Sequence, residues 1–411
     1  MLHCSIVLLG SLAARADTPM QGLGETTAIL TRLRRSMPGL LNPAVTSPDG
    51  MVDTETFGEN PGALRMLSYS PPGLPPGAPL VVVLHGCTQN GQGYARDAGW
   101  ITLADRLGFS VLAPEQRAAN NPNRCFNWFE PGDTRRGQGE AASIAAMVTT
   151  ALAACEGDPR QVFVTGLSAG GAMSAVMLSA YPEMFAGAAI IAGLPYGVAR
   201  GVPDALRVMG QGDGRSGAAL GGLVARKTGA TLRLSIWHGD ADYTVNRANA
   251  ENLADQWTAA TALDGGSATI ERLKGRTRSV WRGETGGSVV ELNIVHGLGH
   301  GTPLATKEAD GIGRPAPYML EAGISSTQEI ARFWGLGAGV ARRAEAGQSP
   351  VRPEEQDAAA EEAPVQKLGQ DAGPARPSGV AAQVLDAVSA HVPADVRAVI
   401  AKALRAAGLM T

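Results

Sequence analysis

A serine set between two glycines, where an apolar run meets an alanine-rich run, constrains the fold more than any other feature of the sequence. The segment reads QVFVTGLSAGG. Residues 162–166 are typical of a fully buried parallel strand, and residues 169–180 have helix-compatible spacing. Gly166 and Gly170 stand where a sharp strand-to-helix turn leaves no room for a Cβ atom. We therefore predict a nucleophile elbow that exposes the hydroxyl of Ser168 above a sheet edge.

The rest of the chain alternates strand-like and helix-like runs in the same way. Such alternation is typical of a mostly parallel sheet with helices on both faces, so we predict an α/β fold. Residues 63–70 are expected to form an outer strand. The other predicted strands are 80–84, 109–114, 162–166, 186–192, 232–237 and 292–295, and the predicted helices are 97–107, 140–154, 169–180, 248–260 and 327–334.

Composition divides the chain into four expected parts. Residues 1–58 read as a leader with a helix over 26–35, and residues 59–338 hold the alternating pattern of a catalytic domain. Residues 339–380 are rich in Ala, Glu, Gln, Pro and Gly, which predicts a disordered linker. Residues 381–411 predict two short amphipathic helices. Their apolar faces either pack on the body or on each other, or contact a hydrophobic granule, a polymer or a partner protein.

The net charge and the hydropathy of the chain argue against nucleic acid and a membrane as partners. The chain has 411 residues and a formal net charge of −3. Its isoelectric point is near 6.1. This balance gives no electrostatic footprint for nucleic acid, and no apolar run is long enough to span a bilayer.

The N-terminal segment can be interpreted in two ways. Residues 5–12 form a short apolar run followed by small residues, as in a secretory signal, but His3 stands where such signals carry Lys or Arg. An amphipathic helix fits the same residues. We favour a secreted, extracellular or periplasmic protein over a cytoplasmic one.

Four cysteines are too few to define a disulfide framework in a chain of this length. Cys87 and Cys125 fall in loops near the expected site. They would form a bridge in an exported protein, and otherwise they are buried thiols.

Two downstream loops supply the partners that a serine nucleophile needs. The hydroxyl requires a histidine oriented by a carboxylate. Asp240 and Asp242 follow a strand-like run at its carboxyl end; one would orient the imidazole and the other would tighten the turn. His300 lies in the glycine-flanked loop GLGHG after a later strand and is the expected base, whereas His296 is expected to be structural. The order serine, acid, histidine is that of α/β hydrolases.

Ester chemistry also needs N–H groups aimed at the developing oxyanion. Ala169, which follows the serine, is expected to supply one. The second is expected from LHGCTQNG, after an early buried strand, with Cys87 first and Thr88 next. Cys87 could itself be a nucleophile, but nothing in the sequence places an elbow around it.

Six motifs in order resemble the poly(3-hydroxybutyrate) depolymerase family of esterases, over residues 63–336. They are LHGCTQNG, APEQ, CFNWFEP, GLSAGGAMS, IWHGDADYTVN and GLGHGTPL. The resemblance implies an α/β-hydrolase fold and a triad of Ser168, Asp242 and His300, because the acid of the family lies in H-G-x-x-D-x-x-V. It also implies an oxyanion N–H from Cys87 and a place for Trp128 near the substrate cleft.

The expected activity is hydrolysis of a carboxylic ester through an acyl-enzyme, without a metal or organic cofactor. The preferred substrate class is a 3-hydroxyalkanoate oligomer or polymer, contacted by Trp128 and Thr88; Trp128 is otherwise a core or rim aromatic. The sequence lacks the Ser/Thr-rich linker and the aromatic-rich binding module of secreted polymer-degrading members. Feruloyl and acetylxylan esterases are also similar, so a carbohydrate-linked ester is the alternative. A non-catalytic protein that binds a granule or partner is the rival from another class.

Overall fold

The structure is a computed structural model that describes residues 45–46, 49–224, 233–263, 267–283 and 289–337. The predicted leader helix over 26–35, the linker over 339–380 and the helices of 381–411 lie outside the described residues. The four-part division of the chain therefore stays a prediction.

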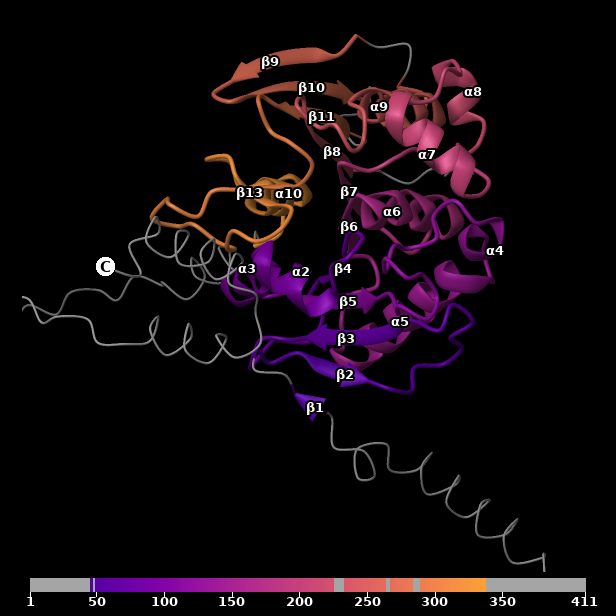
Figure 1. Cartoon of the computed structure of the whole chain (residues 1–411). Coiled ribbons are helices and arrows are strands. Elements are labelled where there is room, and N and C mark those ends of the chain that lie inside the picture. The colour runs from indigo at the N-terminus through magenta and orange to yellow at the C-terminus, as the bar shows by residue number, and fades with distance from the viewer. Residues whose placement is uncertain (1–44, 47–48, 225–232, 264–266, 284–288, 338–411) are drawn as a thin grey trace, which may run out of the picture. The chain divides into compact units, whose positions relative to one another are not determined.

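A single large sheet organises the described residues, and its central strands are parallel (Figure 1). The strand order is β1-β2-β3-β5-β4-β6-β7-β8-β11-β10-β9. Strands β5, β4, β6, β7, β8 and β11 run parallel, and antiparallel strands extend the sheet at both edges. The strands are β1 Val45–Thr46, β2 Val52–Thr54, β3 Arg65–Tyr69, β4 Leu80–Leu84, β5 Ser110–Glu115, β6 Val162–Leu167, β7 Gly187–Ile191, β8 Arg233–Gly239, β9 Thr269–Leu273, β10 Arg276–Arg282 and β11 Val289–Val295.

Helices cover both faces of this sheet, which confirms the α/β class. Helices α5, α6 and α9 pack on one face, and α2, α3 and α10 pack on the other. A small parallel pair, β12 Thr302–Leu304 and β13 Met319–Glu321, lies apart from the main sheet. The helices are α2 Gly91–Asp97, α3 Trp100–Leu107, α4 Pro131–Thr134, α5 Gly139–Ala154, α6 Ala169–Ala180, α7 Val202–Gln211, α8 Gly217–Gly221, α9 Ala248–Ala260 and α10 Ser326–Trp334.

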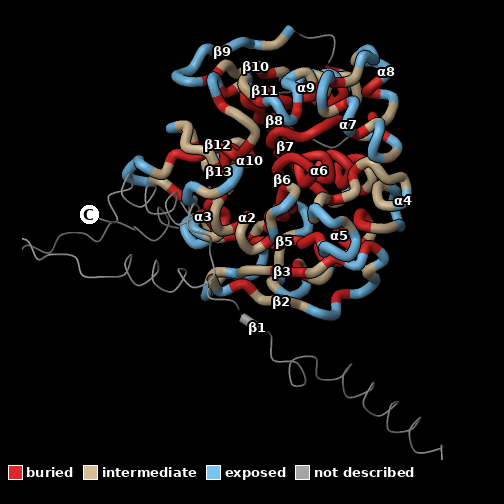
Figure 2. The backbone as a smooth tube through the Cα atoms, viewed as in Figure 1, coloured by how far each residue is buried: buried red, intermediate tan, exposed pale blue. Residues whose placement is uncertain are grey.

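The strands are buried on both faces because their apolar residues do not alternate with polar ones. In β4, Val82 belongs to the core beneath α5 and α6, whereas Val83 belongs to the core beneath α2 and α3. Figure 2 shows the central strands buried along their length and the exposed residues on the outer helices and loops. Such strands read as continuous apolar runs in the sequence, as parallel strands between two helix layers do.

Most predicted elements are found within two residues of their predicted ends, but three predictions differ. The helix expected over 97–107 begins three residues later, at Trp100, because Gly99 adopts φ +86° and a Cβ there would lie 2.8 Å from the backbone nitrogen of Gly313; a separate helix that was not predicted, α2, ends at Asp97. The last strand, β11, begins three residues earlier than predicted. The expected outer strand is β3, and it is not an edge, because β2 pairs with its far side.

The hairpin of β9 and β10 and the helices α7 and α8 were not predicted. Strand β9 is exposed over most of its length and carries no buried apolar face that the sequence could reveal. Helix α7 has two buried residues, Ala205 and Val208. Both elements bury few residues, so neither appears in the sequence as the long apolar run that marks the predicted elements.

Candidate active site

The turn between β6 and α6 holds Ser168 in a backbone conformation that serine rarely adopts. Its φ is +57° and its ψ is −117°. A Cβ on Gly166 would lie 2.4 Å from the carbonyl carbon of Gly170, and one on Gly170 would lie 2.1 Å from Leu84 O. The Ser168 N–H donates to Ile191 O at 2.9 Å, which ties the turn to the neighbouring strand. Such strain costs about 1–3 kcal/mol and persists only where the surrounding packing imposes it.

The loops after β8 and β11 bring a carboxylate and an imidazole together. His300 Nδ1 lies 2.7 Å from Asp242 Oδ2. The other carboxylate oxygen, Oδ1, accepts the N–H groups of Thr244 at 2.8 Å and Val245 at 2.9 Å. Both oxygens of the carboxylate are therefore held, and the imidazole is oriented by one of them.

The charge state of Asp242 follows from these contacts. Burial raises the pKa of this carboxyl, whereas the hydrogen bonds from His300 and from the N–H of Val245 lower it. The lowering is the larger effect, so the pKa of Asp242 lies below its ordinary value. An ionised carboxylate only accepts hydrogen bonds, so Nδ1 of His300 carries the hydrogen. In the neutral imidazole, Nε2 is then the nitrogen without a hydrogen, as a general base requires.

The two other candidates of these loops make structural contacts instead. Asp240 Oδ1 accepts the N–H of Gly297 at 2.7 Å, so this carboxylate joins the two loops. His296 Nε2 lies 3.0 Å from Thr277 Oγ1, on the neighbouring strand. These contacts fit the turn and structural roles expected for Asp240 and His296.

A cavity of about 470 Å³ opens at this edge of the sheet and is lined by both Ser168 and His300. Trp128 and Thr88 also line it, as does Tyr318, whose ring meets the His300 ring edge-on with centroids 6.0 Å apart. Among the described residues that form the lining, none is Asp, Glu, Lys or Arg. The cavity is thus a largely apolar chamber with its nucleophile and base candidates on one wall.

The loop after β4 leaves one N–H group unengaged beside this cavity. Gly86 N donates to Gln89 Oε1 at 2.8 Å. Thr88 N donates to Asn123 O at 2.6 Å. Between them, the N–H of Cys87 has no partner among the described residues. Of the two oxyanion candidates in this loop, the geometry leaves Cys87 available and Thr88 occupied.

The other oxyanion candidate stands at the start of α6. Ala169 is the first residue of this helix, and its N–H belongs to the first turn, where backbone donors have no intrahelical acceptor. The helix dipole adds positive potential at the same point. The N–H of Ala169 is therefore available to an anion above Ser168.

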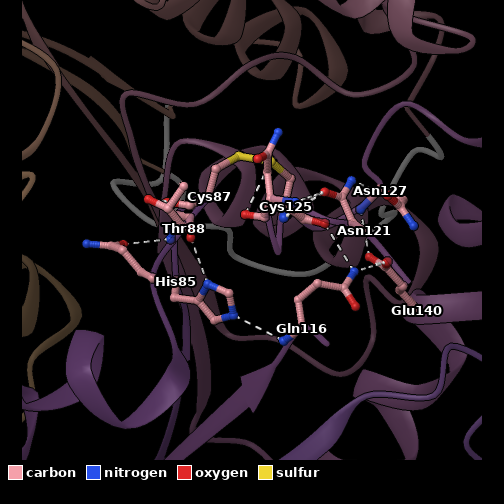
Figure 3. The surroundings of a disulfide bond; sticks show 11 residues. His85, Cys87, Thr88, Gln116, Asn121, Cys125, Asn127 and Glu140 are labelled. Carbon is pink, nitrogen blue, oxygen red and sulfur yellow. Dashed lines mark hydrogen bonds between the residues drawn. A yellow bond between two sulfur atoms is a disulfide. The ribbon is translucent and has the colours of Figure 1, made fainter. Parts of the chain in front are cut away.

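A disulfide joins Cys87 to Cys125, with Cα atoms 4.2 Å apart (Figure 3). It connects the loop after β4 with the loop that carries Trp128, and both cysteines line the cavity. The sequence left the pairing open. In the structure the bridge fixes one wall of the cavity to the loop that holds the unengaged N–H group.

A buried polar network supports this wall, and no motif in the sequence predicts it. Asn127 N donates to Glu140 Oε2 at 2.8 Å, and the side chain of Gln116 donates to Glu140 Oε1 and to Cys125 O (Figure 3). Burial raises the pKa of Glu140 to about 8, and the charge of Asp133 adds to this effect. The disulfide loop therefore rests on a carboxyl group with very little solvent contact.

His85 holds the start of the same loop. Its Nε2 accepts the N–H of Gln116 at 3.0 Å, so Nδ1 carries the hydrogen and donates to Gly86 O at 2.7 Å (Figure 3). Burial lowers the pKa of His85 to about 4, which keeps it neutral. A histidine next to the expected oxyanion loop is thus a structural residue.

Other residues that line the cavity were not predicted from the sequence either. Helix α7 contributes Val202, Ala205, Leu206 and Met209 to the cavity lining. No motif marks them, because the connection that follows β7 has no characteristic sequence. Their position depends on how α7 packs against α9.

The part of the chain that the structure describes contains neither a cluster of metal-binding side chains nor a helix that could span a membrane. No group of three or more His, Cys, Asp or Glu side chains is placed there to hold a metal ion. None of the described helices has the length and apolar character needed to cross a bilayer.

Comparisons with known proteins agree on the kind of protein. Residues 64–281 match the family model described as Esterase PHB depolymerase. Over 315 residues the chain is 40% identical to poly(3-hydroxyalkanoate) depolymerase C of Paucimonas lemoignei, which covers 74% of this chain and 76% of that protein. It is 29% identical over 265 residues to feruloyl esterase B of Talaromyces funiculosus, with 62% and 73% covered.

A solved structure confirms the expected fold. The acetyl xylan esterase from Aspergillus awamori superposes with a TM-score of 0.57 at 24% identity, covering 69% of this chain and 98% of that one. The described residues therefore have the α/β-hydrolase fold.

Proposed function

Because the chain belongs to the Esterase PHB depolymerase family, it is a carboxylic ester hydrolase, and we propose that Ser168, Asp242 and His300 carry out the hydrolysis. The observation that carries this proposal is the 2.7 Å contact of His300 Nδ1 with Asp242 Oδ2, made beside a cavity that Ser168 and His300 share. The strained turn at Ser168 supports the same assignment, since such strain concentrates at functional residues.

In this mechanism His300 Nε2 takes the hydroxyl proton as Ser168 Oγ attacks the ester carbonyl. The N–H groups of Ala169 and Cys87 bind the oxyanion of the tetrahedral intermediate. His300 then gives its proton to the departing alcohol, which leaves an acyl group on Ser168. Water repeats the sequence and releases the acid, while Asp242 keeps the imidazole in its reactive tautomer.

We further propose that the substrate is a 3-hydroxyalkanoate oligomer or polymer. The relative from Paucimonas lemoignei is named for this activity. An uncharged, mostly apolar cavity suits the aliphatic acyl units of such a polyester. Trp128 and Thr88 line this cavity and are proposed to contact the substrate.

Exposed apolar side chains at the cavity mouth support a water-insoluble substrate. Val202 and Leu206 are 52% and 63% exposed, and Tyr318 is 40% exposed; all three line the cavity. Tyr243 is 98% exposed and precedes Thr244, another lining residue. Grouped exposure of this kind marks an interaction surface. We call these four residues the apolar rim.

The disulfide supports an oxidising compartment for the working enzyme, because disulfides are rare in proteins of the reducing cytosol. We therefore propose that the protein works outside the cytoplasm. Contact of the C-terminal helices with a granule or partner remains a proposal from the sequence, since residues 381–411 lie outside the described residues.

The test is product release from three substrates by one purified preparation: amorphous poly(3-hydroxybutyrate), soluble 3-hydroxybutyrate oligomers and methyl ferulate. The Ser168→Ala variant is the blank, and Ser174→Ala, in the helix that follows the turn, is the matched serine control. Release from the hydroxybutyrate substrates, absent with Ser168→Ala, supports the proposal. Release from methyl ferulate alone would transfer the protein to the carbohydrate-linked esterases and keep the mechanism. Full activity of Ser168→Ala would reject the proposed nucleophile.

A further inference from the structure

His238 is a second imidazole beside the carboxylate that orients His300. It lies near the end of β8 and its side chain is buried. Its Nε2 is 2.8 Å from Val245 O and 3.5 Å from Asp242 Oδ2. The same oxygen, Oδ2, accepts the hydrogen bond from His300 Nδ1. One carboxylate oxygen thus lies between two imidazoles.

The contact with Val245 O determines the tautomer of His238. A carbonyl oxygen only accepts hydrogen bonds, so Nε2 carries the hydrogen. The other ring nitrogen, Nδ1, is buried and has no partner among the described residues. A hydrogen on Nδ1 would be a buried donor without an acceptor, and burial lowers the pKa of this imidazole. His238 is therefore the neutral Nε2–H tautomer.

Val245 connects His238 to the turn that carries Asp242. Its N–H donates to Asp242 Oδ1 at 2.9 Å, and its carbonyl accepts from His238 Nε2 at 2.8 Å. The imidazole thus holds the far end of the turn that aims the carboxylate at His300. A leucine would fill the same space without leaving a buried nitrogen unpartnered, so packing alone does not account for a histidine at this position.

We propose that His238 is a positioning residue of the hydrolytic reaction, whose neutral Nε2–H group fixes the Asp242 turn and offsets part of the carboxylate charge that acts on His300. The proposal rests on the proposed roles of Asp242 and His300. His238 does not line the cavity and so touches no substrate. The charged and titratable groups that act on it are Asp242, His300 and Arg247, which caps α9.

Loss of the Nε2–H group has two consequences. The turn loses its anchor at Val245, so the imidazole of His300 is held less well and kcat falls, while KM stays near the parent value because no substrate contact is lost. More of the carboxylate charge also acts on His300, which favours its protonated form. Since only neutral His300 can act as the base, the acid limb of the kcat/KM profile moves to higher pH.

Two amides form a matched pair for the test. In His238→Gln the amide nitrogen can reach the position of Nε2 and donate to Val245 O; in His238→Asn the shorter side chain ends near Nδ1, where nothing accepts. We expect the Gln variant to keep the parent kcat and acid limb. We expect the Asn variant to lose kcat roughly 10- to 100-fold, as a displaced catalytic group does, and to show the shifted limb. His296→Gln is the control, because it removes a nearby imidazole that does not contact Asp242.

Thermal unfolding of each variant identifies any that does not fold, and the parent protein gives an independent test. Nitrogen-15 spectra of histidine-labelled parent protein should show His238 neutral, with Nδ1 unprotonated, throughout the pH range of the kcat/KM profile. A protonated Nδ1 would overturn the proposal, and so would equal kcat and acid limbs in folded Gln and Asn variants. Activity in Ser168→Ala would instead reject the proposed function. If Ser168→Ala is inactive but the His238 variants keep the parent kcat and acid limb, only the positioning role of His238 is rejected.

Discussion

His300 Nδ1 lies 2.7 Å from Asp242 Oδ2, although 58 residues separate the two along the chain. The contact exists because β8 and β11 are neighbouring parallel strands, with Gly239 opposite Val295 at their carboxyl ends. The two loops that follow therefore begin side by side at one edge of the sheet, which is where sites of open α/β sheets collect. The pair is thus a product of strand order and register.

We expect Asp242→Asn to reduce kcat by about 10⁴-fold with little change in KM, because an amide at this position stabilises the wrong imidazole tautomer. Asp240→Asn is the matched control: its remaining carbonyl oxygen can still accept the N–H of Gly297, so activity should stay near that of the parent. Steady-state kinetics on a short p-nitrophenyl ester measure both. A larger loss in Asp240→Asn than in Asp242→Asn would exchange the two assignments.

Glu140 should make the unfolding free energy depend on pH. Its pKa is raised from 4.5 to about 8 in the folded protein. Below about pH 4.5 the carboxyl is protonated in both the folded and the unfolded states. Between 4.5 and about 8 the unfolded chain is ionised and the folded protein is not, so unfolding releases a proton. The unfolding free energy contributed by this group therefore falls as pH rises, by at most about 1.4 kcal/mol per unit, and levels off above pH 8.

Glu140→Gln removes this titration. As pH rises from 5 to 8, the unfolding free energy of the variant should increase relative to that of the parent. Any constant amount by which the altered hydrogen bonds shift this difference does not change its dependence on pH. Urea unfolding at four pH values in this range measures it. Parallel pH profiles would show that Glu140 is ionised in the folded protein like an ordinary glutamate.

The disulfide should stabilise both the protein and the cavity wall. Cys87 and Cys125 are 38 residues apart, and closing a loop of that length is worth about 4 kcal/mol of unfolding free energy. We expect the Cys87→Ser, Cys125→Ser double variant to lose about this amount and to show a raised KM, because both residues line the cavity. Cys155→Ser, which removes a described cysteine that forms no disulfide, should change neither value. Unaltered stability and KM in the double variant would contradict the role given to the bridge.

The apolar rim should matter for solid polymer and not for soluble substrates. We expect Tyr243→Ser to slow hydrolysis of a poly(3-hydroxybutyrate) film, because this exposed side chain, which does not itself line the cavity, would no longer bury apolar area on the polymer. Hydrolysis of soluble oligomers should change little. Ile270→Ser on β9 is the control, since that residue is 60% exposed and lies outside the cavity lining. Equal losses of hydrolysis rate on the film and on the oligomers would show that the rim acts as part of the substrate-binding cavity instead.

Local sequence was enough to predict an element where its backbone geometry requires particular residue types. The elbow is readable because glycine is required on both sides of Ser168 at fixed spacing, and the central strands are readable because burial on both faces leaves only apolar residues. The motif H-G-x-x-D-x-x-V distinguished Asp242 from Asp240, which composition and spacing did not.

Residues whose position depends on distant packing could not be predicted. His238 reads in the sequence as a strand residue before a turn, and its closeness to Asp242 Oδ2 follows from how that turn folds back. Glu140 reads as the polar start of a helix, and its burial depends on the disulfide loop that lies over it. Leu206 and Tyr318 come from segments that carry no recognised motif, so their meeting at one cavity required the structure.

The proposed mechanism depends on acylation of Ser168, and the position of the acyl group can be determined. The parent protein would be mixed with p-nitrophenyl butyrate, quenched in acid within the burst phase and digested, and the peptides would be examined by mass spectrometry. We predict a butyryl group on Ser168, and none anywhere in the Ser168→Ala variant. A butyryl group on another residue, or turnover by Ser168→Ala at the parent rate, would contradict the account.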